Sequence, residues 1–217
     1  MSHVCKVLLV DDHAMVMEAL AEHLSREPGF EVVGTAPDAE TAIDKALVSN
    51  PDVVVMDIDM PGLISFDAAD RIQSLLDRAR VVFLSAFTHD RYIQQALAVK
   101  ARAYVTKGEP LGRVIEAIRT VARGGTYFSR QIRERLVVDR GRVELPADNT
   151  RISALSEREV QVLRYVASGM SKKEIAQTMH LSVKTVENHC TNLMAKLNIH
   201  DRVELARFAI REKLAEA

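Results

Sequence analysis

Lys6-Val7-Leu8-Leu9-Val10-Asp11-Asp12 is an apolar run that ends on two carboxylates. Three later apolar runs also end on a polar side chain: residues 53–56 on Asp57, 81–84 on Ser85 and 103–106 on Lys107. Continuous runs rich in β-branched residues are typical of strands buried on both faces, as in a parallel sheet. Ligands bind outside the carboxyl ends of such strands. The sequence therefore predicts one site made of three carboxylates, a hydroxyl and an ammonium group.

The first 124 residues alternate between strand and helix patterns. Strand-like runs lie at 5–10, 30–35, 52–56, 80–85 and 102–105. Helical periodicity separates them at 13–27, 38–49, 66–78, 89–99 and 110–123. This alternation predicts an α/β domain, residues 1–124, whose parallel sheet carries helices on both faces. Gly124-Gly125 ends the pattern, so we expect residues 125–150 to form a linker with a short helix near 129–138.

Residues 151–217 show no strand pattern and predict an all-α domain of four short helices. Two of these helices begin with Ser-x-x-Glu capping boxes, at residues 156–159 and 171–174. A third helix, about 183–197, places Val186, Cys190, Leu193 and Leu197 on one buried stripe. Its other face is polar. Two helices joined by a tight turn are the parts of a helix-turn-helix, whose second helix enters the major groove of DNA.

Composition and charge limit the classes of protein. The chain has 217 residues, of which 47% are hydrophobic, as in an ordinary globular protein. No run reaches the ~18 apolar residues of a membrane helix, and two cysteines, Cys5 and Cys190, predict no disulfide framework, as in a reduced cytoplasmic protein. Residues 1–124 carry 18 acidic and 13 basic side chains, whereas 151–217 carry 8 and 11. We therefore expect different partners for the two domains.

The ordered set of motifs resembles one known family. Asp11-Asp12, Asp57 followed by Met60-Pro61-Gly62, Ser85-Ala86 and Lys107 resemble the receiver domain of a two-component response regulator. Residues 156–211, with Thr185-Val186-Glu187-Asn188-His189, resemble the LuxR-type helix-turn-helix. Together they are similar to the NarL/FixJ class of response regulators. The resemblance implies a flavodoxin-like sheet with strand order 2-1-3-4-5.

The resemblance also implies the chemistry of the first site. Asp57 would accept a phosphoryl group, since a carboxylate can attack phosphorus to give an acyl phosphate. Mg²⁺ prefers hard oxygen ligands; they would come from Asp12, Asp57 and the main-chain carbonyl of Asp59, with Asp11 acting through water. The ammonium of Lys107 would neutralise phosphoryl charge. After phosphorylation, Ser85 would donate a hydrogen bond to the phosphoryl group and Tyr104 would swing inward.

For the second domain the resemblance implies contacts with double-stranded DNA. Glu187 and Asn188 are short enough to contact base edges, and Lys172, Lys184 and Lys196 would contact phosphates, with Thr185 and Thr191 on the same helix face. Many relatives carry Lys or Arg at the position of Glu187. The expected partners are a histidine kinase, a two-fold promoter site, RNA polymerase and a second copy of the chain when phosphorylated. The expected location is the cytoplasm, and the expected function is transcriptional regulation rather than enzymatic turnover.

Two alternatives use the same residues. Asp57-Ile58-Asp59 after a strand matches the start of the haloacid-dehalogenase phosphatase motif, in which the second aspartate is a general acid; Met60-Pro61 and the late position of the strand disfavour it. A DNA-binding regulator with a degenerate receiver is disfavoured because every acidic-site residue is present. Lys100 and Ala103 stand where glycine is common in receivers, and His13 receives no role.

Overall fold

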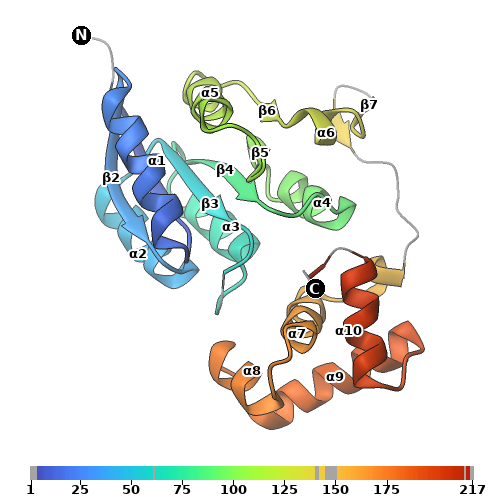
Figure 1. Ribbon diagram of the computed structural model, residues 1–217. Coiled ribbons are helices and arrows are strands. Elements are labelled where there is room, and N and C mark those ends of the chain that lie inside the picture. Colours follow the sequence, from blue (N-terminus) through green and yellow to red (C-terminus); the bar gives the residue numbers. More distant parts are fainter. Residues whose placement is uncertain (1–3, 61, 140–141, 145–150, 213, 216–217) are drawn as a thin grey trace. The chain divides into compact units, whose positions relative to one another are not determined.

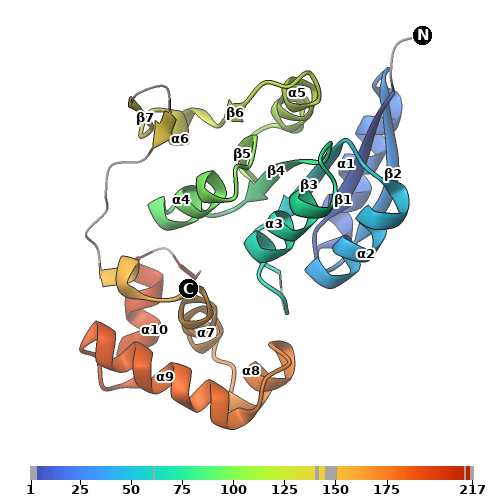
Figure 2. The same ribbon diagram turned by 180° about the vertical axis from the view of Figure 1, so that it is seen from behind.

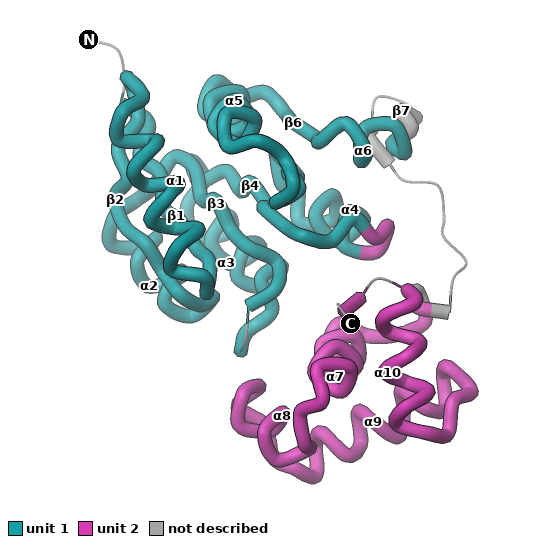
Figure 3. Tube along the Cα trace, in the orientation of Figure 1, with its two compact units in different colours: residues 1–88, 92–146 teal, residues 89–91, 147–217 magenta. Residues whose placement is uncertain are grey.

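The computed structural model describes residues 4–60, 62–139, 142–144, 151–212 and 214–215. Pro61 of the receiver motif and residues 145–150 of the expected linker lie outside this described part. The chain forms two compact units (Figure 3): residues 1–88 with 92–146, and residues 89–91 with 147–217. Within the described residues, no helix is both long and apolar enough to cross a membrane.

A six-stranded parallel sheet forms the centre of the first unit. Its strands lie in the order β2-β1-β3-β4-β5-β6, which confirms the predicted α/β class and adds one strand. The strands are β1 (Cys5–Val10), β2 (Phe30–Ala36), β3 (Val53–Asp57), β4 (Arg80–Ser85), β5 (Ala103–Thr106) and β6 (Tyr127–Phe128). The register pairs Val10 with Met56, Asp57 with Leu84, and Ser85 with Thr106. The carboxyl ends of β1, β3, β4 and β5 therefore meet at one edge.

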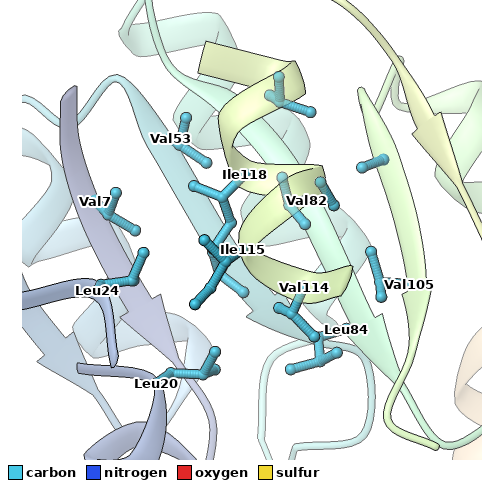
Figure 4. Close-up of a cluster of buried hydrophobic side chains, with 14 of the residues drawn as sticks. Val7, Leu20, Leu24, Val53, Val82, Leu84, Val105, Val114, Ile115 and Ile118 are labelled. Carbon is cyan, nitrogen blue, oxygen red and sulfur yellow. The ribbon is translucent and has the colours of Figure 1, made fainter. Parts of the chain in front are cut away.

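Helices cover both faces of this sheet. One face carries α1 (Ala14–Arg26) and α5 (Leu111–Ala122) (Figure 1), and the other carries α2 (Ala39–Ser49), α3 (Ser65–Leu75) and α4 (Asp90–Ala98) (Figure 2). On the first face, Leu20 and Leu24 of α1 and Ile115 and Ile118 of α5 pack with alternate strand residues such as Val82 (Figure 4). Each buried aliphatic side chain contributes about 1.5–3 kcal/mol relative to exposure. On the other face, the rings of Phe66 and Phe83 pack 4.9 Å apart.

Residues 127–144 differ from the sequence prediction. The predicted short helix near 129–138 is present only as the single turn α6 (Arg130–Arg133); it follows the two-residue strand β6 and precedes an antiparallel ribbon of β7 (Val137–Asp139) and β8 (Arg142–Glu144). The β-branched pair Val137-Val138 favours extended backbone over helix. Strands this short produce no periodic signal in the sequence. The segment expected to link the two domains thus begins as part of the first unit's sheet.

The second unit contains the four predicted helices after a 3₁₀ turn, η1 (Arg151–Ala154): α7 (Glu157–Ala167), α8 (Lys172–Thr178), α9 (Val183–Leu197) and α10 (Arg202–Arg211). Both capping boxes are formed, so at the start of α7 and of α8 the main-chain N–H groups of the cap serine and of the glutamate three residues later are hydrogen-bonded. The Ser182 hydroxyl caps α9, which ends at Asn198 in left-handed conformation. The predicted stripe of Val186, Cys190, Leu193 and Leu197 is buried.

Candidate functional site

The sheet register brings the predicted acidic-site residues together. Asp11 and Asp12 directly follow β1, Asp57 ends β3, and Lys107 follows β5. Asp11 and Asp57 are only 3% and 2% exposed. Lys107 Nζ lies 2.9 Å from Asp57 Oδ2 and 2.8 Å from Asp11 Oδ2. One ammonium group thus connects the ends of three strands.

Burial and the charge of Lys107 shift the pKa of Asp57 in opposite directions. Its burial raises the pKa of the carboxyl to about 6, and the nearby Lys107 ammonium opposes that rise. Burial lowers the pKa of Lys107, but the Asp57 and Asp11 carboxylates outweigh it, so the net shift is upward and the lysine stays charged. Two carboxylates, those of Asp11 and Asp57, contact this single ammonium, and the third, Asp12, lies beside His13. The site therefore has an excess of negative charge.

A divalent cation fits this donor set. The Oδ1 atom of Asp57 is buried and accepts no hydrogen bond, although an unpaired buried carboxylate oxygen is unfavourable. Hard oxygen ligands suit Mg²⁺. One ligand atom each from Asp11, Asp12, His13 and Asp57 lie within 4.8 Å of one another. Asp59 lies two residues beyond β3 and is half-buried.

His13 is the member of this cluster that sequence reasoning missed. Its Nδ1 lies 2.8 Å from Asp12 Oδ1 and 3.1 Å from Asp11 Oδ1, and its main-chain N–H donates to Asp11 Oδ1 at 2.9 Å. The charge of Asp12 raises the pKa of the imidazole. The only sequence signal is adjacency to the acidic pair, since a lone histidine has no ligand spacing.

Ser85 and Tyr104 lie beside one another behind the acidic cluster. Ser85 is fully buried, and its Oγ accepts the main-chain N–H of Phe87 at 3.0 Å. Tyr104 is also fully buried, and its hydroxyl donates to the carbonyl of Phe87 at 2.7 Å. Burial raises the pKa of Tyr104, and a hydrogen bond with Ser85 opposes that rise. The tyrosine ring is thus already inside the protein in this structure.

The sixth strand attaches to this same region. Ser129 is fully buried; its N–H donates to the carbonyl of Tyr104 and its Oγ accepts the N–H of Thr106, each at 3.0 Å. Because Thr106 precedes Lys107, these bonds fix the backbone that carries the lysine. Ser129 could not be predicted from sequence, because its hydrogen-bond partners lie more than 20 residues away along the chain.

In the second unit, α8 and α9 place the predicted polar residues on the surface. The Glu187 carboxylate lies 3.4 Å from Lys172 Nζ and 3.7 Å from Lys184 Nζ. Asn188 and Thr191 are exposed on the same helix, and the Thr191 hydroxyl donates to the Glu187 carbonyl. The Thr185 hydroxyl lies 2.8 Å from that of Ser182, the helix cap. Glu187 therefore holds two of the proposed phosphate-binding lysines.

Lys196 has a partner that the sequence did not predict. Its Nζ lies 2.7 Å from Glu159 Oε2, and the Glu159 side chain is only 4% exposed. Glu159 also accepts the N–H of Ser156 as part of the α7 capping box. Burial opposes ionisation of Glu159, but its hydrogen bonds with Lys196 and Ser156 outweigh that effect and lower its pKa. The pair joins the beginning of α7 to the end of α9.

Two protein families match the chain. Residues 7–119 match the response regulator receiver domain. Residues 153–209 match the luxR family of bacterial regulatory proteins. The two matches follow one another in the order that the sequence motifs predicted.

Individual relatives extend over nearly the whole chain. Oxygen regulatory protein NreC from Staphylococcus epidermidis is 34% identical over 216 residues, covering 97% of this chain and 99% of NreC. A structure of RcsB from Salmonella typhimurium has a TM-score of 0.72 at 22% identity and covers 95% of this chain and 96% of that one. RcsB from Salmonella enterica bound to promoter rprA in the presence of phosphomimetic BeF3⁻ has a TM-score of 0.64 at 20% identity, covering 94% and 97%. The chain belongs to the response regulators of the NarL/FixJ class, in which a receiver domain precedes a LuxR-type DNA-binding domain.

Proposed function

We propose that Asp57 accepts a phosphoryl group from a histidine kinase and that this event controls dimerisation and promoter binding. The observation that carries the proposal is the state of the Asp57 carboxylate. It is buried at the end of β3. Its Oδ2 atom accepts a hydrogen bond from Lys107, and its Oδ1 atom accepts none. A carboxylate held in this way is available to attack phosphorus.

The acidic residues would hold Mg²⁺. Asp12, Asp57 and the Asp59 carbonyl would bind it directly, and Asp11 through water. Bound Mg²⁺ supplies positive charge that lets an anionic donor approach and stabilises the phosphoryl oxygens. Lys107, already 2.9 Å from Asp57, would stay charged and pair with the transferred group. The Ser85 hydroxyl would give up its hydrogen bond with the Phe87 main-chain N–H and donate a hydrogen bond to a phosphoryl oxygen. Tyr104 would keep its inward position behind Ser85.

The second domain would bind double-stranded DNA through α9. Lys172 and Lys184 would contact phosphates, and Asn188, Glu187, Thr185 and Thr191 would face the groove. We propose that the main role of Lys196 is its ion pair with Glu159. A phosphate contact by Lys196 would use the same ammonium group. This mode of binding is supported by the similarity of the fold to that of RcsB in its promoter-bound structure. We propose domain boundaries at 1–124 and 151–217, with a linker between them. We also propose that the protein acts in the cytoplasm and that its partners include RNA polymerase and a second copy of the chain.

Acetyl phosphate with Mg²⁺ tests the first step. Wild type should gain the mass of one phosphoryl group, stable in acid and labile in base, and chelation of Mg²⁺ or Asp57→Asn should abolish the gain. Asp59→Asn is the matched control, because we assign only a main-chain carbonyl to Asp59. It should still be labelled. Labelling of Asp57→Asn at the wild-type rate would refute the assignment. Turnover of phosphomonoesters that required Asp59 would instead favour the phosphatase alternative.

A further inference from the structure

Strand β5 directly precedes Lys107 and has a longer neighbour on one side than on the other. On one side β4 runs beside it to its end, where Ser85 pairs with Thr106 and the Lys107 N–H donates to the Ser85 carbonyl at 2.8 Å. On the other side β6 pairs with the first two residues of β5, Ala103 and Tyr104. The main-chain N–H of the buried Thr106 therefore lies beyond the paired part of β6.

The side chain of Ser129 accepts the hydrogen bond that a longer β6 would accept. The Ser129 N–H donates to the Tyr104 carbonyl at 3.0 Å, and the Ser129 Oγ accepts the Thr106 N–H, also at 3.0 Å. A hydroxyl oxygen thus continues the pairing of β5 beyond the last residue of β6. Ser129 is fully buried, so removal of this oxygen would leave the Thr106 N–H without an acceptor in a buried place, which is unfavourable.

The hydroxyl of Ser129 is not used as the side chain of a serine at a helix start usually is. Ser129 is the N-cap residue of α6, a position where a serine side chain ordinarily accepts a main-chain N–H of its own helix. Here the side chain makes no capping bond, and the Ile132 N–H donates to the Ser129 carbonyl. The hydroxyl therefore bonds to β5 rather than to the helix that it precedes.

We propose that Ser129 is a positioning residue for phosphoryl transfer to Asp57. It acts through Thr106 on Lys107, whose Nζ lies 2.9 Å from Asp57 Oδ2. A displacement of ~1 Å caused by a change far from the reacting atoms can slow a reaction about 10²-fold. Ser129 follows residues 7–119, which match the receiver family, so the reaction depends on a segment beyond that match. This inference rests on the proposed function of Asp57 and adds a residue to it.

Labelling of the full-length protein by acetyl phosphate at saturating Mg²⁺ tests the proposal. Ser129→Ala should lower the labelling rate by about tenfold or more, while calorimetric titration should show a Mg²⁺ affinity within about twofold of wild type. The affinity should persist because the proposed metal ligands follow β1 and β3, not β5. Ser129→Thr keeps the hydroxyl and should recover most of the rate.

Ile132→Val is the matched control for a general loosening of this segment. The Ile132 side chain is fully buried in α6, so its shortening disturbs packing without removing the acceptor of the Thr106 N–H. This variant should be labelled at close to the wild-type rate. If Ser129→Ala does not fold, Ser129→Cys serves in its place, because it offers a weaker acceptor of similar size and should also slow labelling.

A double-mutant cycle with Lys107 tests whether Ser129 acts through the lysine. Both backgrounds are compared at an acetyl phosphate concentration that labels Lys107→Ala measurably. Ser129→Ala should slow labelling in the wild-type background and cause little further loss in Lys107→Ala. The same fold reduction in both backgrounds, a wild-type rate for Ser129→Ala, or an equal loss of rate in Ile132→Val would overturn the proposal. Absence of labelling in wild type would instead refute the phosphorylation of Asp57 itself.

Discussion

At the scale of single residues, Asp57 is held in an environment that disfavours its charge. Its pKa is raised to about 6 by burial, against the opposing effect of Lys107, whereas an aspartate in an unfolded chain has a pKa of about 3.9. Because the folded state has the higher pKa, it binds more protons than the unfolded state between about pH 4 and 6. The contribution of Asp57 to stability therefore improves as the pH falls through that window. Above pH 6 the charged group destabilises the fold.

We expect Asp57→Asn to stabilise the metal-free protein at pH 7.5, by on the order of 1–3 kcal/mol. The gain should shrink toward pH 4.5, where wild-type Asp57 is itself protonated in the folded state. Urea unfolding in the presence of a chelator, followed by circular dichroism at both pH values, measures it. Asp12→Asn is the control, because the Asp12 side chain is one-third exposed and should gain less. A gain that did not depend on pH would contradict the electrostatic explanation.

The Glu159–Lys196 pair makes a second residue-scale prediction. Lys196→Met keeps the aliphatic stem but leaves the buried Glu159 carboxylate without its cation. We expect a loss of about 1–2 kcal/mol, reduced by the partial exposure of Lys196. Thermal unfolding measures this loss, and the double variant with Glu159→Gln should recover part of it. The salt dependence of DNA binding is the second readout. If Lys196 contacts a phosphate, Lys196→Met should reduce the magnitude of the slope of log affinity against log salt concentration by about one per subunit. An unchanged slope would mean that Lys196 only pairs with Glu159.

Glu187 and Asn188 should act differently on DNA. Glu187→Gln releases Lys172 and Lys184, so binding to random DNA should strengthen more than binding to the selected site. Asn188→Ala should cost about 1–3 kcal/mol and relax preference at one base pair. Fluorescence anisotropy with selected and random duplexes measures both effects. Glu204→Gln makes the same charge change on α10 and should alter both duplexes little. If every variant shifted both duplexes equally, α9 would not be the reading helix.

At the scale of elements, the end of α4 carries a backbone strain that can be tested. Lys100 takes a left-handed conformation, with φ of 57°, two residues after the end of α4 and three residues before the start of β5. Its N–H donates to the Leu97 carbonyl, and the N–H of Ala101 donates to Ala96. The chain thus turns at Lys100 as it would at a glycine. Only glycine adopts this conformation without a steric penalty.

Lys100→Gly should therefore stabilise the first unit by about 0.5–1 kcal/mol, after the extra freedom of glycine in the unfolded chain is deducted. Lys100→Ala is the matched control: it removes the same charge but keeps the β carbon, so it should give no comparable gain. Chemical denaturation of both variants measures the difference. Equal stabilities of the glycine and alanine variants would show that the left-handed turn carries little strain.

The sequence predicted elements with long patterns closely and short elements poorly. The run at 53–56 and the stripe of α9 gave correct strands and helices, because burial on one or both faces imposes a period on many residues. Tyr127-Phe128 is too short to show any period, so β6 was missed. His13 and the Glu159–Lys196 pair were missed for another reason. Their roles depend on contacts made only after folding, which spacing along the chain does not encode.

At the scale of the whole molecule, the chain joins an acidic unit to a basic one. The first 124 residues carry 18 acidic and 13 basic side chains, and residues 151–217 carry 8 and 11. The phosphoryl group that we propose for Asp57 would change the charge at one point of the first unit, and the proposed function requires DNA binding by the second unit to respond. A change in dimerisation is the simplest link, because a two-fold DNA site binds two copies more tightly than one.

Sedimentation velocity with a labelled duplex selected from a random pool tests this central claim most directly. Wild type treated with acetyl phosphate and Mg²⁺ should sediment as two protomers per duplex at concentrations where untreated protein does not. Asp57→Asn should remain in the untreated distribution under the same treatment. Identical distributions for treated and untreated wild type up to high micromolar concentration, or an equal response from Asp57→Asn, would contradict control of DNA binding by phosphorylation of Asp57.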